Sequence, residues 1–227
     1  MRIDPPATLG MSLNGPDRTA VLVDRVFCYP RAMVRSAPFF GLLLAAALVS
    51  AKPSFSQSNP RCGSMDLPIA SVDKPPTQYS DFCERHPASC VLDGEPTIEW
   101  TIEIHQRLSD VNARVNEEVE LVSDMDNLGL EENWDFPKDC RGDCEDFVLE
   151  KREKLVELGF PRAALTIAIG FHEDRFFPHA VLLAETDSGT WVLDNLHGEV
   201  LCWDATPYRY TRRERPDGMW LRYVRER

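Results

Sequence analysis

Three residues in the second half of the chain are of types that together catalyse acyl chemistry, namely Cys144, His179 and Asp194. Cys144 follows Asp143, a residue type favoured at helix N-caps, and begins a segment with helical periodicity. The partial positive charge at a helix N-terminus favours a thiolate, and the backbone N–H groups there can hold an oxyanion. A cysteine nucleophile needs a base, and the base needs an orienting acceptor. The residue types therefore predict a Cys–His–Asp triad, with His179 as base and Asp194 as its acceptor.

A predicted β-hairpin positions the last two of these residues. His179 begins a strand-like run over residues 179–185, a turn follows at residues 187–189, and a second run over residues 190–193 ends just before Asp194. In antiparallel neighbours joined by a tight turn, the two outer ends meet at the same edge of the sheet. We therefore expect His179 and Asp194 to lie side by side, facing the start of the helix.

The remaining periodicity predicts helices followed by strands. Apolar residues three or four positions apart between residues 104 and 122 predict an amphipathic helix, residues 131–142 a loop, and residues 143–158 a second helix. Gly159 and Pro161 end that helix. Such an order predicts an α+β fold, with N-terminal helices packed on an antiparallel sheet. The predicted strands are residues 164–171, 179–185, 190–193, 200–203, 208–211 and 220–224.

Each candidate also has a simpler interpretation. Cys144 could form a structural disulfide with Cys140, four residues earlier, and His179 could be a hydrogen-bonded strand residue without a catalytic role. Asp194 could cap the turn that follows it, and Asp143 could be an N-cap only. The cysteines and histidines of this region match no common zinc spacing.

The N-terminal region has the pattern of an export signal. Residues 39–49 carry no charge, are too few to span a bilayer, which needs about 20, and are followed by small residues. Arg31 and Arg35 precede them. We expect residues 1–51 to be an N-terminal extension and cleaved signal peptide, with translation starting at Met33. Residues 52–80, rich in Pro and Ser, are expected to form a flexible leader, and residues 81–227 the peptidase domain.

Export would place six cysteines in an oxidising compartment, where most should pair. Cys83 and Cys90 bracket a short loop and are the simplest disulfide to propose. The other pairings stay open, and a free Cys144 would leave at least one further cysteine unpaired or joined to another chain. The net charge of −12 argues against nucleic acid as a partner and suits cations such as calcium.

Three motifs, in order along the chain, resemble the bacterial transglutaminase-like cysteine proteinases. They are GDCED at residues 142–146, PHAVL at 178–182 and VLDN at 192–195, within a likeness that extends from about Phe82 to Trp220. The resemblance implies a papain/transglutaminase-like fold and a cysteine peptidase that cleaves a protein substrate. Its triad would be Cys144, His179 and Asp194.

The best-understood members of that family are periplasmic, calcium-dependent proteases that cut large surface adhesins and so release cells from biofilm. The resemblance therefore implies a periplasmic or secreted protein, an adhesin as substrate and an inner-membrane regulatory receptor as partner. It also implies that the acids beside the nucleophile belong to a calcium site: Asp143 and Glu145, with Asp146 adjacent. Calcium takes six to eight oxygen ligands, so other groups must complete the site. A cation would also offset the repulsion between these acids and a thiolate.

Two other functions fit the same residues. The same thioester, captured by an amine instead of water, would give transglutaminase-type acyl transfer. A non-catalytic module that binds a partner through the groove or the calcium site is the second alternative. The sequence makes no prediction of the oligomeric state.

Overall fold

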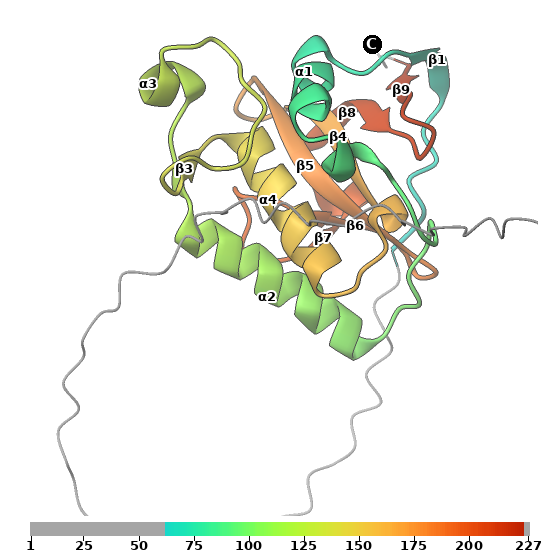
Figure 1. The fold of residues 1–227 in the computed structure, drawn as a ribbon. Helices are drawn as coiled ribbons and strands as arrows, with labels where there is room; N and C mark the ends of the chain where they lie inside the picture. Colours follow the sequence, from blue (N-terminus) through green and yellow to red (C-terminus); the bar gives the residue numbers. More distant parts are fainter. Residues whose placement is uncertain (1–61, 225–227) are drawn as a thin grey trace, which may run out of the picture.

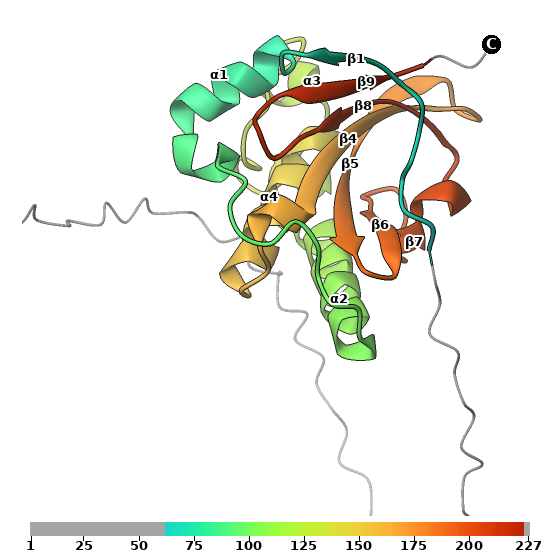
Figure 2. The same cartoon turned by 90° about the vertical axis from the view of Figure 1, so that its right-hand side faces the viewer.

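The computed structural model describes residues 62–224. A seven-stranded antiparallel sheet in the order β1-β9-β8-β4-β5-β6-β7 is covered on one face by helices, with α4 and α2 closest to its centre (Figures 1 and 2). The α+β prediction, with helices packed on an antiparallel sheet, is confirmed. The helices are α1 Thr77–Arg85, α2 Ile102–Glu118, α3 Asp124–Leu128 and α4 Cys144–Glu157. The strands are β1 Ile69–Asp73, β2 Glu120–Leu121, β3 Arg141–Gly142, β4 Leu165–His172, β5 Phe177–Thr186, β6 Gly189–Leu193, β7 Leu201–Cys202, β8 Tyr208–Glu214 and β9 Trp220–Tyr223.

Helix α4 is the central helix of the fold. It packs against β5 on one side and α2 on the other, and it buries apolar residues such as Phe147 and Leu155. Its observed span, Cys144–Glu157, matches the predicted helix over residues 143–158 to within one residue at each end. Because the helix begins at Cys144, the thiol lies at the helix N-terminus, as the sequence predicts.

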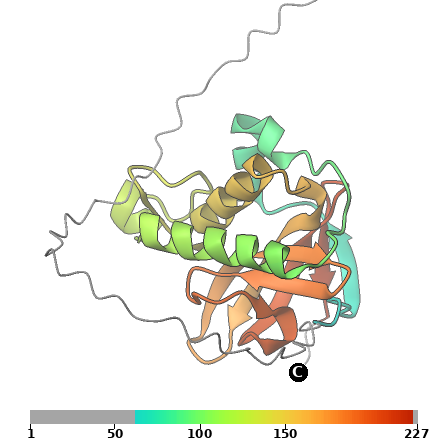
Figure 3. The same cartoon turned by 90° about the horizontal axis from the view of Figure 1, so that it is seen from below.

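Helix α2 lies alongside α4 and β6 (Figure 3). Its first turn is capped by Thr101, whose side-chain oxygen accepts a hydrogen bond from the backbone N–H of Ile104 at 3.1 Å. The predicted apolar stripe is the buried face, with Leu108, Val111 and Val115 in the core. The helix ends at Glu118, so the apolar periodicity up to residue 122 overestimates its length by one turn.

The predicted flexible leader over residues 52–80 is wrong from Cys62 onward. Cys62 is disulfide-bonded to Cys202, β1 pairs with β9, and α1 begins at Thr77. The pattern was missed because β1 is an edge strand with no fully buried residue, so it has little apolar alternation. The predicted signal peptide over residues 1–51 lies outside the described residues.

The other predicted strands are present, although the run over residues 200–203 shortens to β7 at Leu201–Cys202 and a 3₁₀ turn. The sequence did not predict α1, α3 or the short parallel pair of β2 with β3. Between residues 62 and 224, no helix has the length and apolar character needed to cross a bilayer.

Candidate active site

Cys144 is the free cysteine of the described region. Cys62 pairs with Cys202, Cys83 pairs with Cys90, and Cys140 is also disulfide-bonded. The predicted Cys83–Cys90 disulfide is confirmed, and a Cys140–Cys144 disulfide is wrong.

The Cys144 thiol lies between α4 and β5. Its Sγ donates a hydrogen bond to Oε2 of Glu145 at 3.2 Å, and the backbone N–H of Ala180 on β5 also interacts with it. Burial and then the Glu145 carboxylate raise the pKa of the Cys144 thiol well above its usual value, while the Ala180 N–H favours the thiolate. Because Ala180 follows His179 directly in β5, the nucleophile lies beside the strand that carries the candidate base.

His179 and Asp194 are in direct contact. Nε2 of His179 lies 2.7 Å from Oδ1 of Asp194, and both side chains are buried. This is the contact that the hairpin geometry predicts, since β5 and β6 pair with Leu182 opposite Leu193 and Asp194 follows directly. With Nε2 engaged by the carboxylate, Nδ1 is the ring nitrogen left for proton exchange with a nucleophile.

The Asp194 carboxylate has further partners. Oδ1 also accepts a hydrogen bond from the backbone N–H of Leu196 at 3.0 Å, so Asp194 caps its turn as well as contacting His179. Burial raises the pKa of Asp194, but the hydrogen bonds from His179, Leu196 and Tyr208 outweigh this and hold it below its usual value. Asp194 is therefore an ionised acceptor for the imidazole.

Two asparagines on α2 hold the turn that carries Asp194. Nδ2 of Asn116 donates to the backbone carbonyl of Asp194 at 2.9 Å, and Nδ2 of Asn112 donates to the carbonyl of His197 at 3.0 Å. Asn112 is fully buried. These residues were missed as site residues, although two asparagines four positions apart on an apolar helix face are a detectable signal.

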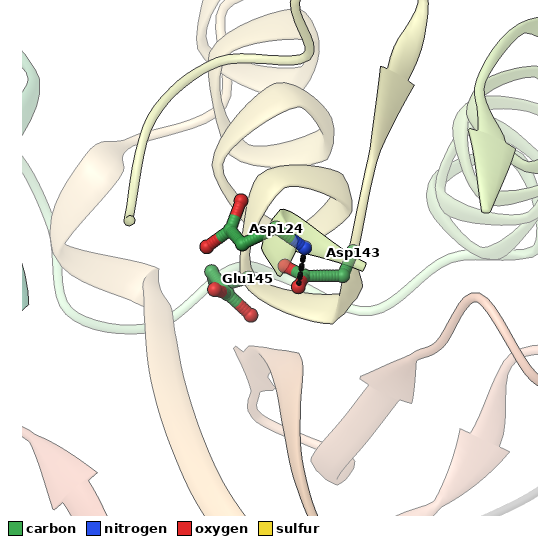
Figure 4. Close-up of side chains that lie close together, drawn as sticks. All are labelled: Asp124, Asp143 and Glu145. Carbon is green, nitrogen blue, oxygen red and sulfur yellow. Dashed lines mark hydrogen bonds between the residues drawn. The ribbon is translucent and has the colours of Figure 1, made fainter. Parts of the chain in front are cut away.

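An acidic cluster lies beside the nucleophile. Asp124, Asp143 and Glu145 each offer a carboxylate oxygen within 4.8 Å of the other two (Figure 4). The sequence prediction included Asp143 and Glu145 but not Asp124, which precedes Asp143 by 19 residues. The parallel pair β2–β3, Glu120–Leu121 with Arg141–Gly142, brings the two segments together.

In this cluster, one oxygen of each carboxylate is held by a donor and the other is not. Asp143 accepts from the backbone N–H of Asp124 at 3.1 Å, Asp124 from the N–H of Asn133, and Glu145 from the Cys144 thiol. The second oxygen of each is buried and accepts no hydrogen bond within the described structure. Asp143 occupies the N-cap position of α4 without a side-chain capping bond, so its interpretation as a simple N-cap does not hold. Carboxylates this close together, each with a buried oxygen that has no donor, are an arrangement that a cation would satisfy.

Asp146, the third predicted ligand, lies next to this cluster with other partners. Its carboxylate accepts hydrogen bonds from the backbone N–H groups of Asp135, at 3.1 Å, and Asp143. Gly142 makes room for it, since a Cβ at that position would lie 2.4 Å from Asp146 Oδ2. Asp146 thus holds the loop before α4, whereas Asp124 lies within the cluster formed with Asp143 and Glu145.

Carboxyl groups in and beside the cluster have raised pKa values. Burial first, and then neighbouring carboxylates, raise the pKa of Asp124 to about 6, that of Asp146 to about 8 and that of Glu145 to about 10. Without a cation, Asp146 and Glu145 therefore hold protons at neutral pH, whereas Asp124 is mostly ionised.

A family model described as bacterial transglutaminase-like cysteine proteinase matches residues 69–226. The chain belongs to this family. It is therefore a cysteine peptidase with a transglutaminase-like fold, and its substrate is a protein. A comparison with curated proteins finds no significant match.

Solved structures similar to this family member include two forms of LapG from Legionella pneumophila. The calcium-bound form is 22% identical, with 66% of this chain and 81% of that chain covered and a TM-score of 0.46. The EGTA-treated form is 23% identical, with 66% and 84% covered and a TM-score of 0.41.

A cavity of about 760 Å³ opens between α4 and the loop over residues 127–139. Its lining includes Asp146 and Asn133 but none of Cys144, His179 and Asp194. It is therefore separate from the candidate triad.

Proposed function

We propose that this peptidase cleaves its protein substrate with Cys144 as nucleophile, His179 as general base and acid, and Asp194 as the acceptor that orients His179. The observation that carries this proposal is the free thiol at the N-terminus of α4, beside a strand whose histidine is bound to a buried carboxylate. Of the described cysteines, Cys144 alone has this placement.

In the proposed mechanism, Nδ1 of His179 takes the thiol proton, and the thiolate attacks the scissile carbonyl carbon. Backbone N–H groups at the start of α4 hold the oxyanion. The imidazolium then gives its proton to the leaving amine, which leaves a thioester on Cys144. Water, deprotonated by His179, attacks the thioester and releases the carboxylate product and the free thiol. Asp194 keeps the proton on Nε2 and stabilises the imidazolium in both halves.

We further propose that Asp124, Asp143 and Glu145 bind a calcium ion. The fit rests on their three buried oxygens without donors and on the hard oxygen chemistry that calcium prefers. A bound cation would neutralise the carboxylates next to Cys144 and so remove their opposition to the thiolate. Asp146, which the sequence predicts as a further ligand, would support this site by holding the loop before α4 through the Asp135 N–H.

The proposed location is the periplasm or the medium, with a large surface adhesin as substrate and an inner-membrane receptor as regulator. The Cys62–Cys202 and Cys83–Cys90 disulfides support an oxidising compartment. The adhesin and the receptor rest on the family resemblance.

The decisive experiment is alkylation of Cys144 by iodoacetamide, followed by mass spectrometry, with calcium and with EGTA. Because the other described cysteines are in disulfides, the modified peptide identifies the reacting thiol. We expect Cys144 at pH 7 with calcium to react at least about tenfold faster than free cysteine, and His179→Ala to remove this excess. A rate no faster than that of free cysteine in the calcium-loaded protein would end the proposal. Incorporation of a labelled amine into a protein substrate would indicate acyl transfer instead.

Calcium binding is tested by thermal melting with calcium and with EGTA. Calcium should raise the melting temperature of the wild type, because a ligand that binds only the folded state stabilises it. Asp124→Asn and Asp143→Asn should lose most of this increase. Asp126→Asn is the matched control, since Asp126 lies in the same short helix but is exposed. If calcium raised the melting temperature of all three variants equally, the ion would bind at another site.

A further inference from the structure

The second oxygen of the Asp194 carboxylate has a partner that the triad does not explain. Oδ1 serves His179 and the Leu196 N–H, whereas Oδ2 accepts a hydrogen bond from the hydroxyl of Tyr208. Tyr208 begins β8, which pairs with β4 and is separated from β6 by β4 and β5. Its hydroxyl therefore reaches across two strands to the end of β6, which local strand pairing would not require.

The ring of Tyr208 also contacts the candidate base. The ring centroids of Tyr208 and His179 are 5.3 Å apart with planes inclined by 35°, and His172 packs edge-on against Tyr208 at 5.3 Å. Tyr208 thus touches both members of the His179–Asp194 pair, one through its ring and the other through its hydroxyl. Tyr208 and His179 are both buried, so packing against each other restricts the movement of both rings.

The Tyr208 hydroxyl is a permanent donor. Burial, followed by the Asp194 charge, raises the pKa of Tyr208 far above its usual value, so the hydroxyl keeps its proton at any pH the protein meets. Hydrogen bonds to both oxygens restrict rotation of the Asp194 carboxylate, and in this orientation Oδ1 lies against Nε2 of His179.

We propose that Tyr208 is a positioning residue of the peptidase, which locks the Asp194 carboxylate and the His179 ring so that Nδ1 faces Cys144. It acts through Asp194 and His179, the two residues of the pair that it contacts. The inference rests on the proposed triad.

The test variant is Tyr208→Phe, which keeps the ring against His179 and removes only the hydroxyl. Its matched control is Tyr210→Phe, on the same strand two residues later. The Tyr210 hydroxyl lies 2.9 Å from the Thr206 hydroxyl, and within the described structure it makes no hydrogen bond to Asp194. Its loss therefore removes a buried hydroxyl and leaves the hydrogen bonds of the His179–Asp194 pair in place. Both variants are measured with calcium in the buffer, and thermal melting establishes that each is folded.

Two measurements separate positioning from a structural role. In Tyr208→Phe, alkylation of Cys144 by iodoacetamide at pH 7 should be slower by about tenfold or more, the range for loss of a hydrogen bond to a charged group. In ¹⁵N-histidine spectra, the Nε2 proton of His179 should be sharp and slow to exchange in the wild type. It should exchange about tenfold faster in Tyr208→Phe and be unchanged in Tyr210→Phe.

Wild-type alkylation and wild-type exchange in folded Tyr208→Phe would overturn the inference, as would equal losses in Tyr210→Phe. A wild-type Cys144 that reacts no faster than free cysteine would instead refute the proposed triad. In that case, the exchange of the His179 proton still reports whether Tyr208 fixes the pair.

Discussion

Lys151 offers a test of how burial sets the stability of this fold. Its side chain, two turns along α4 from Cys144, is completely buried, and its Nζ has no hydrogen-bond partner among the described residues. The Phe147 ring, whose centroid lies 5.8 Å from Nζ, and the charge of Asp194 offset only part of the cost of burying the ammonium group. Burial lowers the pKa of Lys151 from 10.5 to about 7, against the weaker, opposite effect of Asp194.

We predict that Lys151→Met stabilises the protein, most strongly at low pH. Below pH 7 the amine is charged in both the folded and the unfolded protein, so folding carries the full cost of burying that charge. Between pH 7 and 10.5 only the unfolded state binds the proton, and the penalty falls as the pH rises. From these two pKa values, the variant should gain at most about 5 kcal/mol of unfolding free energy at pH 6 and about 2 kcal/mol at pH 9. Methionine has a similar length and no charge, so it fills the same space.

The assay is urea unfolding followed by far-UV circular dichroism, with disulfides intact and calcium constant, at several pH values from 6 to 9. The quantity compared is the difference in unfolding free energy between variant and wild type, because titrations common to both cancel. Lys154→Met is the control, since Lys154 lies one turn later, is partly exposed and pairs with Glu150 at 3.1 Å. A Lys151→Met gain that does not change with pH, or a loss of stability at pH 6, would refute the assignment of a penalised buried amine.

Three further predictions follow from other contacts. Cys202→Ser removes a disulfide that spans 140 residues, and it should lower the unfolding free energy by about 2–5 kcal/mol in urea titrations. Glu214→Ala leaves the fully buried Arg152 guanidinium without the carboxylate that lies 2.7 Å away. It should therefore lower the unfolding free energy by about 3–5 kcal/mol, and a loss under about 1 kcal/mol would contradict this. Calcium affinity, measured by calorimetry at pH 5.5, 6.5 and 7.5, should rise with pH. The pKa values of Asp124 and Glu145 are raised, so protons must leave these carboxyl groups as the ion binds. An affinity that does not change with pH would count against these ligands.

The parts of the site that the sequence predicts are those built by local rules. The start of α4 at Cys144 follows from the periodic segment that begins there, with Asp143 at the N-cap position although it makes no capping bond. The contact of His179 with Asp194 follows from one hairpin, in which a tight turn fixes the register of β5 and β6. Neither inference needs knowledge of distant segments.

Asp124 and Tyr208 show what local rules miss. Asp124 reaches the cluster because two-residue strands pair in parallel, and β2 and β3 are too short to leave an alternating pattern. Tyr208 reaches Asp194 across two intervening strands. In both cases the contact depends on the assembled sheet and loops, so nothing within ten residues of either side chain predicts its partner.

The acids of GDCED take different partners in the structure, which the sequence pattern does not predict. Alternation along GDCED cannot decide which acids face a cation, because the first turn of a helix spreads successive side chains by about 100°. Asp143 and Glu145 turn toward Asp124, whereas Asp146, three residues after Asp143, folds back onto the backbone of the preceding loop over Gly142. The same turn of α4 therefore carries the nucleophile, two acids of the cluster and the acid that fixes the loop. A change in the charge of the cluster must act on the Cys144 thiol, because Glu145 contacts both.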